Sequence, residues 1–474
     1  MLEKRSLFGS RLLSLVGAAL ALAAVAYALP AQGWVDRTGP NGPAPRSGHA
    51  MCYDPVRGYV LMVGQFLAAG GTAYQADAWS WNGSQWTARG AAPLLNVPSP
   101  SYPGSGYALA VHGATSEVFL AGCVGSVQNL GPATVWRWDG TAWTAVASGV
   151  DGASGTALAM AHDPVRQQTV LWSAFRPNQA TVYDGVAWTT RTATSTPQGV
   201  SIYDHAAMAF DPAVGKLVLA LGQNLNARFF EWNGHGWNQR IPPVAPPAGL
   251  AALSTDTARG VVVGLDRDYL SLQPCHTWSY ADGAPTRLPL AVEPTLRQAT
   301  AMAYDPVRDV HVLFGGSMYL GLFPVALFGD TWEFHLGPLA SVTPYGAGCA
   351  GSRGVPQLAA LGGSLPRVGQ TFTTRTTNLP LGGPVFQLLG VSDTDYGGTP
   401  LPLDLTLLGA PGCWLRTSIE TVQPAQNILG AATWSIAIPP VLGATFHLQT
   451  LPFDPTANGL GLTASNGGRV VIGL

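Results

Sequence analysis

The chain has 474 residues, of which 11% are charged, 58 are glycine and 38 are proline. This length is too great for one ordinary hydrophobic core, and the abundance of Gly and Pro favours short strands and turns over helices. The net charge of −2 argues against a nucleic-acid partner and against electrostatic docking on an anionic membrane.

The N-terminus has the layout of a secretory signal peptide. Lys4, Arg5 and Arg11 precede an uncharged run from Leu12 to Leu29, and Ala26-Tyr27-Ala28 offers a small-x-small cleavage site. The run is also close to the length that spans a bilayer, so an uncleaved anchor is the alternative. We therefore expect a secreted or cell-envelope protein that meets a membrane only if the leader stays uncleaved.

A unit of about 45–50 residues then occurs six times. Each copy aligns on an anchor residue that follows a short apolar strand, and four of the anchors read Asp-Pro. The anchors are Asp54, His112, Asp163, Asp211, Asp256 and Asp305. Because Asp before Pro commonly opens a turn, we interpret these carboxylates as turn residues and not as a catalytic ring.

Each copy contains four predicted strands. In the first, small and bulky residues alternate, as in Ala50-Met51-Cys52-Tyr53, which predicts a slim face and a bulky face packed between neighbouring sheets. The second is a continuous apolar run such as YVLMVG, and the third carries aromatic residues such as Trp79 and Trp81. A two-residue Asn-Gly or Asp-Gly turn is predicted next in five copies, and the fourth strand opens on Trp in four.

Six repeats of four strands predict a six-bladed β-propeller. The second strand that ends in Gly315-Gly316, followed by an aromatic strand, a short turn and Trp, resembles the kelch-type (galactose oxidase-like) propellers in a divergent bacterial form. Copy six lacks a fourth strand, and Gln32-Gly33-Trp34-Val35 matches the fourth strands of other copies. We predict that this segment pairs with the third strand of copy six and closes the ring.

The C-terminal region contains no copy of the unit. Its short strands, punctuated by Gly and Pro, predict a small β-sandwich. Cys349 and Cys413 are the only cysteines there and are predicted to form a disulfide after export. The pattern YGAGC…LPLDLTLLGAPGC…FHLQ resembles a C-terminal module of secreted bacterial repeat proteins. The expected division is a signal peptide at 1–31, a propeller at 32–340 and a sandwich-like domain at 341–474.

No catalytic or metal motif stands out. No Cys/His cluster has the spacing of a zinc site, and no Tyr/Cys/His set can be assigned to copper. His49 and His205 are interpreted as strand-end residues, and DTDYGG from Asp393 as an ordinary turn, with a calcium loop as the alternative. No cofactor or metal is therefore expected.

The predicted topology separates two faces of the propeller. The tight-turn face carries the turns between strands one and two and between strands three and four. The variable face carries the longer connections between strands two and three and between blades, where function usually lies. The aromatic and polar residues expected on the variable face, and predicted to bind a ligand, are Tyr74, Tyr102, Arg176, Tyr203, Arg267, Tyr269, His276 and Tyr319.

The leading hypothesis is an exported, non-catalytic binding or scaffold protein that presents the variable face to a protein or a glycan. The first alternative is an enzyme on the same propeller, either a glycan-acting hydrolase or lyase or a copper oxidase. The second is a structural cell-surface protein. Two carboxylates converging within about 5–10 Å on the variable face would favour a glycosidase, and converging Tyr and His side chains would favour a copper oxidase.

Overall fold

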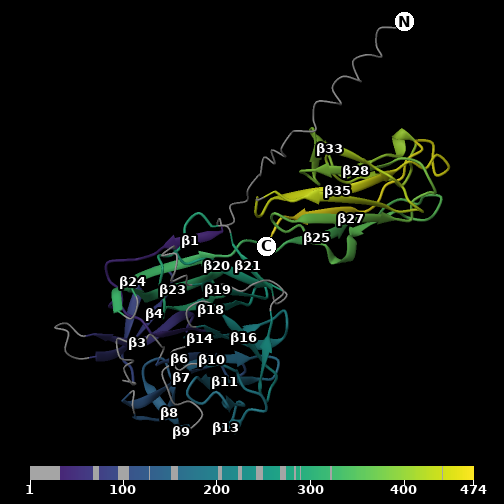
Figure 1. Cartoon of the computed structure of the whole chain (residues 1–474). Coiled ribbons are helices and arrows are strands. Elements are labelled where there is room, and N and C mark those ends of the chain that lie inside the picture. Colours follow the sequence, from purple (N-terminus) through teal and green to yellow (C-terminus); the bar gives the residue numbers. More distant parts are fainter. Residues whose placement is uncertain are drawn as a thin grey trace. The chain divides into compact units, whose positions relative to one another are not determined.

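The computed structural model describes residues 32–473 except 68–73, 94–105, 127–128, 151–157, 201–204, 223–226, 242–248, 267–273, 282–283, 289, 321–322 and 440. The described chain forms two compact units, Gln32–Leu336 and Gly337–Leu474, and both are built from strands (Figure 1). The predicted leader lies outside the described residues. Within those residues, no helix is long and apolar enough to cross a membrane.

In the described part of the chain, the first unit contains six four-stranded antiparallel sheets, one for each repeat. Blade one contains β2 (Ala50–Asp54), β3 (Tyr59–Leu67), β4 (Tyr74–Trp81) and β5 (Trp86–Ala91), and blade two contains β6 (Ala108–His112), β7 (Glu117–Ser126), β8 (Asn129–Trp138) and β9 (Trp143–Val150). Blade three contains β10 (Leu158–Asp163), β11 (Gln168–Ser173), β12 (Gln179–Tyr183) and β13 (Trp188–Thr192), and blade four contains β14 (His205–Asp211), β15 (Lys216–Gly222), β16 (Arg228–Trp232) and β17 (Trp237–Arg240). Blade five contains β18 (Leu250–Asp256), β19 (Val261–Asp266), β20 (Thr277–Ala281) and β21 (Ala284–Arg287). Blade six contains β22 (Ala301–Asp305), β23 (Val310–Leu320), β24 (Phe323–His335) and β1 (Gly33–Asp36). The first strands of neighbouring blades contact one another around the whole ring, including β22 with β2, which confirms the predicted propeller.

The N-terminal strand β1 closes the ring as predicted. It pairs antiparallel with β24, and Trp34 lies opposite Phe334. Trp34 Nε1 donates a hydrogen bond to Thr277 Oγ1 of blade five at 2.7 Å. In the same way, Trp86 Nε1 of blade one donates to Thr331 Oγ1 of blade six at 2.8 Å. The N-terminal strand therefore makes the same inter-blade hydrogen bond as the fourth strand of blade one.

The slim and bulky faces of the first strands pack against each other. Ala301 and Ala303 of β22 lie in one apolar cluster with Met51 and Tyr53 of β2. The same pairing joins β2 to β6, β6 to β10, β10 to β14 and β14 to β18. A small residue on one blade leaves room for a large one on the next, so the alternation predicted this packing correctly.

In blades one to four the turns predicted as two-residue hairpins are four-residue loops, whereas in blade five Ala281 pairs with Ala284 and leaves the predicted two-residue connection. In blade one the loop spans residues 82–85. Asn82 Oδ1 accepts hydrogen bonds from the backbone N–H groups of Ser84 and Gln85, and Gly83 has a φ of 97°. The Asn or Asp of these turns thus serves as an acceptor, and the glycine supplies the left-handed conformation.

Strands two and three of several blades extend further than predicted. β23 and β24 pair as far as Leu320 and Phe323, with a bulge between Phe314 and Gly316. The bulge shifts the register and lets the ladder continue beyond the blade. The connections expected at Val124–Thr134 and Ser317–Phe328 are mostly strand, and at Phe66–Ala76 the described residues 66–67 and 74–76 are strand.

The second unit is a sandwich of two sheets. One has the order β25-β36-β35-β28-β33 and the other β26-β27-β34, and two short hairpins, β29-β30 and β31-β32, accompany them. The strands are β25 (Ser341–Tyr345), β26 (Gln357–Ala360), β27 (Thr371–Thr377), β28 (Val385–Gly390), β29 (Asp395–Tyr396), β30 (Thr399–Pro400), β31 (Leu403–Asp404), β32 (Trp414–Leu415), β33 (Thr421–Ala425), β34 (Ala432–Ala437), β35 (Thr445–Pro452) and β36 (Gly467–Val471). Leu358 and Phe372 of the smaller sheet share one core with Phe446 and Val470 of the larger, as two facing sheets require.

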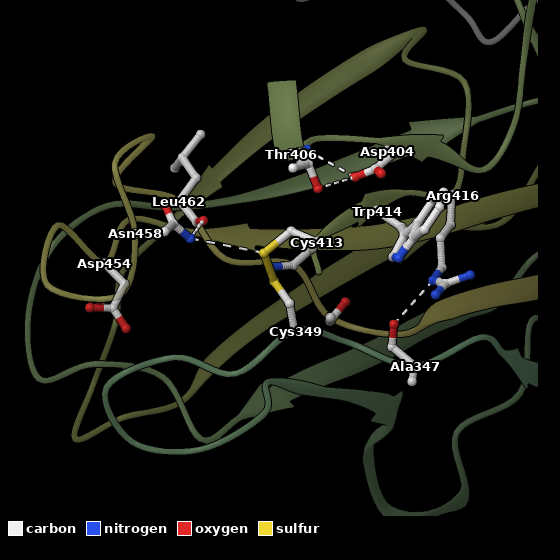
Figure 2. Close-up of a disulfide and its surroundings, with 12 residues drawn as sticks. Ala347, Cys349, Asp404, Thr406, Cys413, Trp414, Arg416, Asp454, Asn458 and Leu462 are labelled. Carbon is white, nitrogen blue, oxygen red and sulfur yellow. Dashed lines mark hydrogen bonds between the residues drawn. A yellow bond between two sulfur atoms is a disulfide. The ribbon is translucent and has the colours of Figure 1, made fainter. Parts of the chain in front are cut away.

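The predicted disulfide joins Cys349 to Cys413, with an S–S distance of 2.07 Å (Figure 2). Both residues are buried in a second apolar cluster of this unit. The bridge ties the segment after β25 to the beginning of β32. Of the three cysteines outside this disulfide, Cys123 and Cys275 are buried and Cys52 is half-buried.

Replacing Trp34 by Ala should destabilise the propeller by about 3–5 kcal/mol, because it removes buried packing and the hydrogen bond to Thr277. Unfolding in urea, followed by circular dichroism, measures this loss. Val35 on the same strand is 38% exposed, and Val35→Ala should change the free energy of unfolding by less than about 0.5 kcal/mol. Equal losses for the two variants would contradict the closing role of Trp34.

Replacing both Cys349 and Cys413 by Ala should lower the free energy of unfolding of the second unit by about 4 kcal/mol. The reason is the larger entropy of the unfolded chain once a bridge over 64 residues is removed. Differential scanning calorimetry should show one transition moving down in temperature. A shift in the transition of the propeller would refute the assignment of this bridge to the second unit alone.

Candidate functional site

The anchor carboxylates are used inside the turns of the tight-turn face. Asp54, Asp163, Asp256 and Asp305 are at most 2% exposed, and each accepts the backbone N–H of the arginine three residues later. Each also forms an ion pair with the side chain of that arginine. The interpretation of these residues as turn residues is confirmed.

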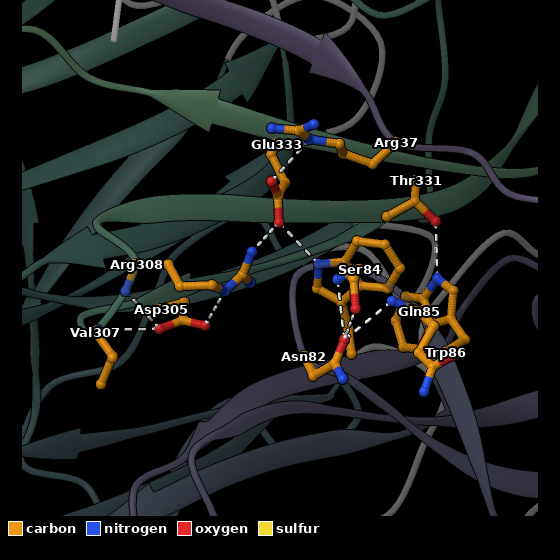
Figure 3. A network of polar contacts seen from close by, with 11 residues as sticks. Arg37, Asn82, Ser84, Gln85, Trp86, Asp305, Val307, Arg308, Thr331 and Glu333 are labelled. Atoms are coloured by element: carbon orange, nitrogen blue, oxygen red, sulfur yellow. Dashed lines mark hydrogen bonds and ion pairs between the residues drawn. The ribbon is translucent and has the colours of Figure 1, made fainter. Parts of the chain in front are cut away.

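The turn arginines also connect neighbouring blades. Figure 3 shows Arg308 beside Glu333 of β24, whose carboxylate accepts the indole Nε1 of Trp81 in blade one at 2.8 Å. Arg57 of blade one likewise donates to the carbonyl oxygen of Asp139 in blade two. The polar groups of this face therefore hold the ring together. The sequence Asp-Pro-Val-Arg occurs in three copies. The prediction of turns used its Asp-Pro part but not the arginine, which makes the contact between blades.

The variable face carries a repeated polar unit, which is clearest in blade six. Arg297 is 1% exposed, and its guanidinium donates to both oxygens of Asp330 at 2.8 and 2.7 Å. Trp332 Nε1 donates to Asp330 Oδ2 at 2.7 Å, and Arg297 also donates to the carbonyl oxygen of Gly315 at 2.9 Å. The ion pair is thus neutral and hydrogen-bonded on both sides.

Blade one repeats the unit residue for residue. Arg46 is buried and donates to Asp77 and to the carbonyl oxygen of Gly64. Trp79 Nε1 donates to Asp77 Oδ2 at 2.8 Å. Because two blades share the same closed set of partners, we interpret this unit as part of the scaffold.

Blade five replaces this unit with a different set. Asp266 stands where the other two blades have the glycine, His276 where they have the aspartate and Ala248 where they have the arginine. Asp266 Oδ2 accepts from Trp278 Nε1 at 2.9 Å and lies 3.1 Å from His276 Nδ1. Asp266 Oδ1 accepts the backbone N–H of His276 at 2.5 Å. In blade five the carboxylate therefore lies on the second strand, and an imidazole occupies the position of the aspartate of blades one and six.

Asp266 orients the ring of His276. Since the carboxylate can only accept, we assign the imidazole proton to Nδ1, and Nε2 then carries the lone pair. The His276 side chain is 20% exposed, and no described residue hydrogen-bonds to its Nε2. An oriented imidazole of this kind can accept a hydrogen bond from a ligand or take up a proton.

Glu293 lies in the connection to blade six and binds Thr277, the residue that follows His276 in the chain. Its Oε2 accepts from Thr277 Oγ1 at 2.7 Å, and its Oε1 accepts the backbone N–H of Thr277 at 3.3 Å. Burial raises the pKa of Glu293, the hydrogen bonds from Thr277 and the nearby His276 oppose this, and the charge of Asp266 adds to it. Two carboxylates therefore flank the segment His276–Thr277 on the variable face.

The remaining histidine and acidic candidates have structural roles. His49 is buried against Phe314, and burial together with the charge of Arg46 lowers its pKa to about 3. His205 is also buried. The segment from Asp393 folds into the β29–β30 hairpin. Within the described residues, no three His, Cys, Asp or Glu side chains gather into a group that could hold a metal ion.

Of the residues predicted to bind a ligand, His276 lies in the blade-five cluster and Arg176 does not. Arg176 is exposed in a turn of blade three, where its backbone N–H donates to the carbonyl oxygen of Ser173. Blade four separates blades three and five, so the structure does not bring Arg176 and His276 into one cluster.

The other predicted residues divide into two groups. Tyr74 and Tyr319 were expected in loops, but their backbones belong to β4 and β23, where the hairpin ladders extend. The predictions that lie outside the described residues are Tyr102, Tyr203, Arg267 and Tyr269.

Asp266, Trp278 and Glu293 were not among the predicted site residues. For Asp266 the signal is present in the sequence, because the residue ten positions after the anchor is Gly64 and Gly315 in blades one and six but Asp266 in blade five. Glu293 lies in the connection between blades five and six, and the sequences of these connections differ from copy to copy, so its role could not be read from the repeat.

Asp266→Asn should release the ring orientation of His276, because an amide can either donate to or accept from Nδ1. The ¹⁵N spectrum of the neutral imidazole should show a protonated Nδ1 in the wild type and both tautomers in the variant. Asp330→Asn in blade six is the control and should leave the His276 signals unchanged. A mixture of tautomers in the wild type would show that Asp266 does not fix the ring.

No protein-family model and no curated protein sequence matches the chain. An exo-β-1,3-galactanase from Phanerochaete chrysosporium, solved with β-1,3-galactotriose, is 10% identical at a TM-score of 0.38, with 92% of this chain and 100% of that chain covered. A protein of unknown function from Dyadobacter fermentans is 11% identical at a TM-score of 0.43, with 64% and 98% covered. The SapL1 lectin in complex with α-methyl fucoside is 12% identical at a TM-score of 0.40, with 58% and 88% covered. At these TM-scores the similarities carry no argument for function.

Proposed function

We propose that the chain is an exported, non-catalytic binding protein that presents the variable face of its propeller to a ligand, with blade five as a main contact. The supporting observation is the exchange of the Arg-Asp-Trp unit for Asp266, His276 and Trp278. If blade five served only as scaffold, the neutral ion pair found in blades one and six would suit it equally well. A partly exposed imidazole with a fixed lone pair fits a ligand contact better than a packing role.

Two further proposals accompany this one. The repeat pattern around Gly315-Gly316, on a propeller with aromatic third strands, supports a distant relationship to the kelch-type propellers. The predicted leader at 1–31, together with the disulfide of the second unit, supports export to an oxidising compartment.

A glycan-acting hydrolase is the second candidate, because Glu293 has a raised pKa and lies near a second carboxylate, Asp266. A general acid needs such a pKa, whereas both oxygens of Asp266 already accept hydrogen bonds from His276 or Trp278. This engagement makes Asp266 a poor nucleophile, and for that reason we favour binding over hydrolysis.

The chain without its leader should bind at least one ligand on an array of glycans and envelope proteins. His276→Ala should weaken that binding about tenfold, the effect of losing one hydrogen bond. Val186→Ser, at a residue of the tight-turn face that is 87% exposed, is the control and should leave binding within about twofold. Failure to bind anything on either array would argue for a purely structural protein, and equal losses in the two variants would remove the variable face from the proposal.

A further inference from the structure

The side-chain hydrogen-bond donors of His276, Thr277 and Trp278 are all directed toward the two carboxylates. Trp278 Nε1, His276 Nδ1 and the backbone N–H of His276 point to Asp266. The hydroxyl and the backbone N–H of Thr277 point to Glu293. What the described cluster offers to a ligand is therefore a set of acceptors, namely His276 Nε2 and the remaining lone pairs of Glu293. A group that binds here has to donate.

The described part of the cluster contains two carboxylates and no arginine or lysine. Within the described residues, neither Asp266 nor Glu293 forms an ion pair with an arginine or a lysine. The guanidinium that approaches from the same connection, Arg297, is bound by both oxygens of Asp330. The raised pKa of Glu293 agrees with this charge distribution, since burial and a neighbouring carboxylate both disfavour its ionised form. A bound cation would lower the energy of this site, and a bound anion would raise it.

An aromatic surface lies beside the acceptors. The indole Nε1 of Trp278 and the imidazole Nδ1 of His276 converge on the same oxygen, Asp266 Oδ2, at 2.9 and 3.1 Å. Trp278 is half-buried, packs against an apolar cluster of blades four and five, and is held by that hydrogen bond. Indole faces attract both cations and the apolar faces of ring-shaped ligands.

We propose that blade five binds an amine-bearing saccharide, whose ammonium group donates to His276 Nε2 while Glu293 supplies the opposite charge and Trp278 contacts the sugar ring. The inference rests on the proposed binding function and names its ligand class. It excludes acidic saccharides, which would place a carboxylate or sulfate beside two carboxylates. A lysine side chain offers the same ammonium group but no ring for Trp278, which is why we favour the saccharide.

Isothermal titration calorimetry of the full chain without its leader tests the inference with four probes. The probes are a hexamer of β-1,4-linked glucosamine, its N-acetylated form, a hexamer of galacturonic acid and a hexalysine peptide. The glucosamine hexamer should bind at least tenfold more tightly than each of the others. Tighter binding of the acidic hexamer, or equal binding of hexalysine, would overturn the ligand class.

Two variants locate the effect. His276→Ala should weaken binding of the glucosamine hexamer at least tenfold, and Glu293→Gln should remove its advantage over the N-acetylated hexamer. Glu231→Gln in blade four, where the carboxylate pairs with Lys216 at 2.6 Å, is the matched control and should leave the affinity unchanged. Thermal unfolding of each variant shows that it is folded. Unchanged affinity in both blade-five variants would overturn the proposal.

Acidification gives an independent readout. Because the pKa of Glu293 is raised above the usual 4.5, its charge is lost at a higher pH than that of an ordinary glutamate. Loss of the Glu293 charge removes the counter-charge of the ammonium group, so the affinity of the wild type for the glucosamine hexamer should fall relative to that of Glu293→Gln as the pH is lowered toward 5. A ratio of the two affinities that stays constant over this range would contradict the inference. If an array ligand binds through the variable face while the glucosamine hexamer does not, the ligand class fails and the binding function stands; if no ligand binds at all, both fail.

Discussion

Closure of the ring through blade six is the constraint on which this propeller depends, and a hydrogen bond from a fourth-strand tryptophan to a threonine of the preceding blade secures the interface on each side of that blade. Trp86 makes it from blade one to blade six, and Trp34 makes it from blade six to blade five. Without Trp34 and its strand, blade six would have three strands and an open edge. The same contact reaches the candidate site, because the hydroxyl that Trp34 binds belongs to Thr277, which in turn donates to Glu293. Closing the ring and ordering the site are thus parts of one network.

The two faces of the propeller use their polar residues differently. On the tight-turn face, Asp305 and Arg308 pair with each other, and Arg308 also reaches Glu333. On the variable face, blades one and six keep a closed Arg-Asp-Trp unit, whereas blade five leaves the Nε2 of His276 without a partner among the described residues. Blades one and six satisfy the scaffold with this closed unit, so the different set of residues in blade five tells more about function.

Much of the fold could be predicted because its signals are local and repeated. The alternation in Ala50-Met51-Cys52-Tyr53 predicted inter-blade packing, and the match of Trp34 to the fourth strands predicted closure. Turn length and strand ends were predicted less well, because the Asx acceptor at Asn82 and the bulge at Gly316 depend on backbone geometry that the sequence does not display.

The site was harder to predict than the fold. His276 was found from its place on the variable face, but its partners Asp266 and Glu293 lie on either side of it along the chain and meet only after β19 and β20 have paired. The replacement of glycine by Asp266 becomes visible only when the alignment of the copies is extended from the first strand to the end of the second.

A crystal structure of the chain with the glucosamine hexamer would show whether blade five holds the saccharide. We predict an ammonium nitrogen at about 2.7–3.2 Å from His276 Nε2 and a sugar ring against Trp278. An ordered saccharide found only on the tight-turn face, or only on the second unit, would contradict this prediction.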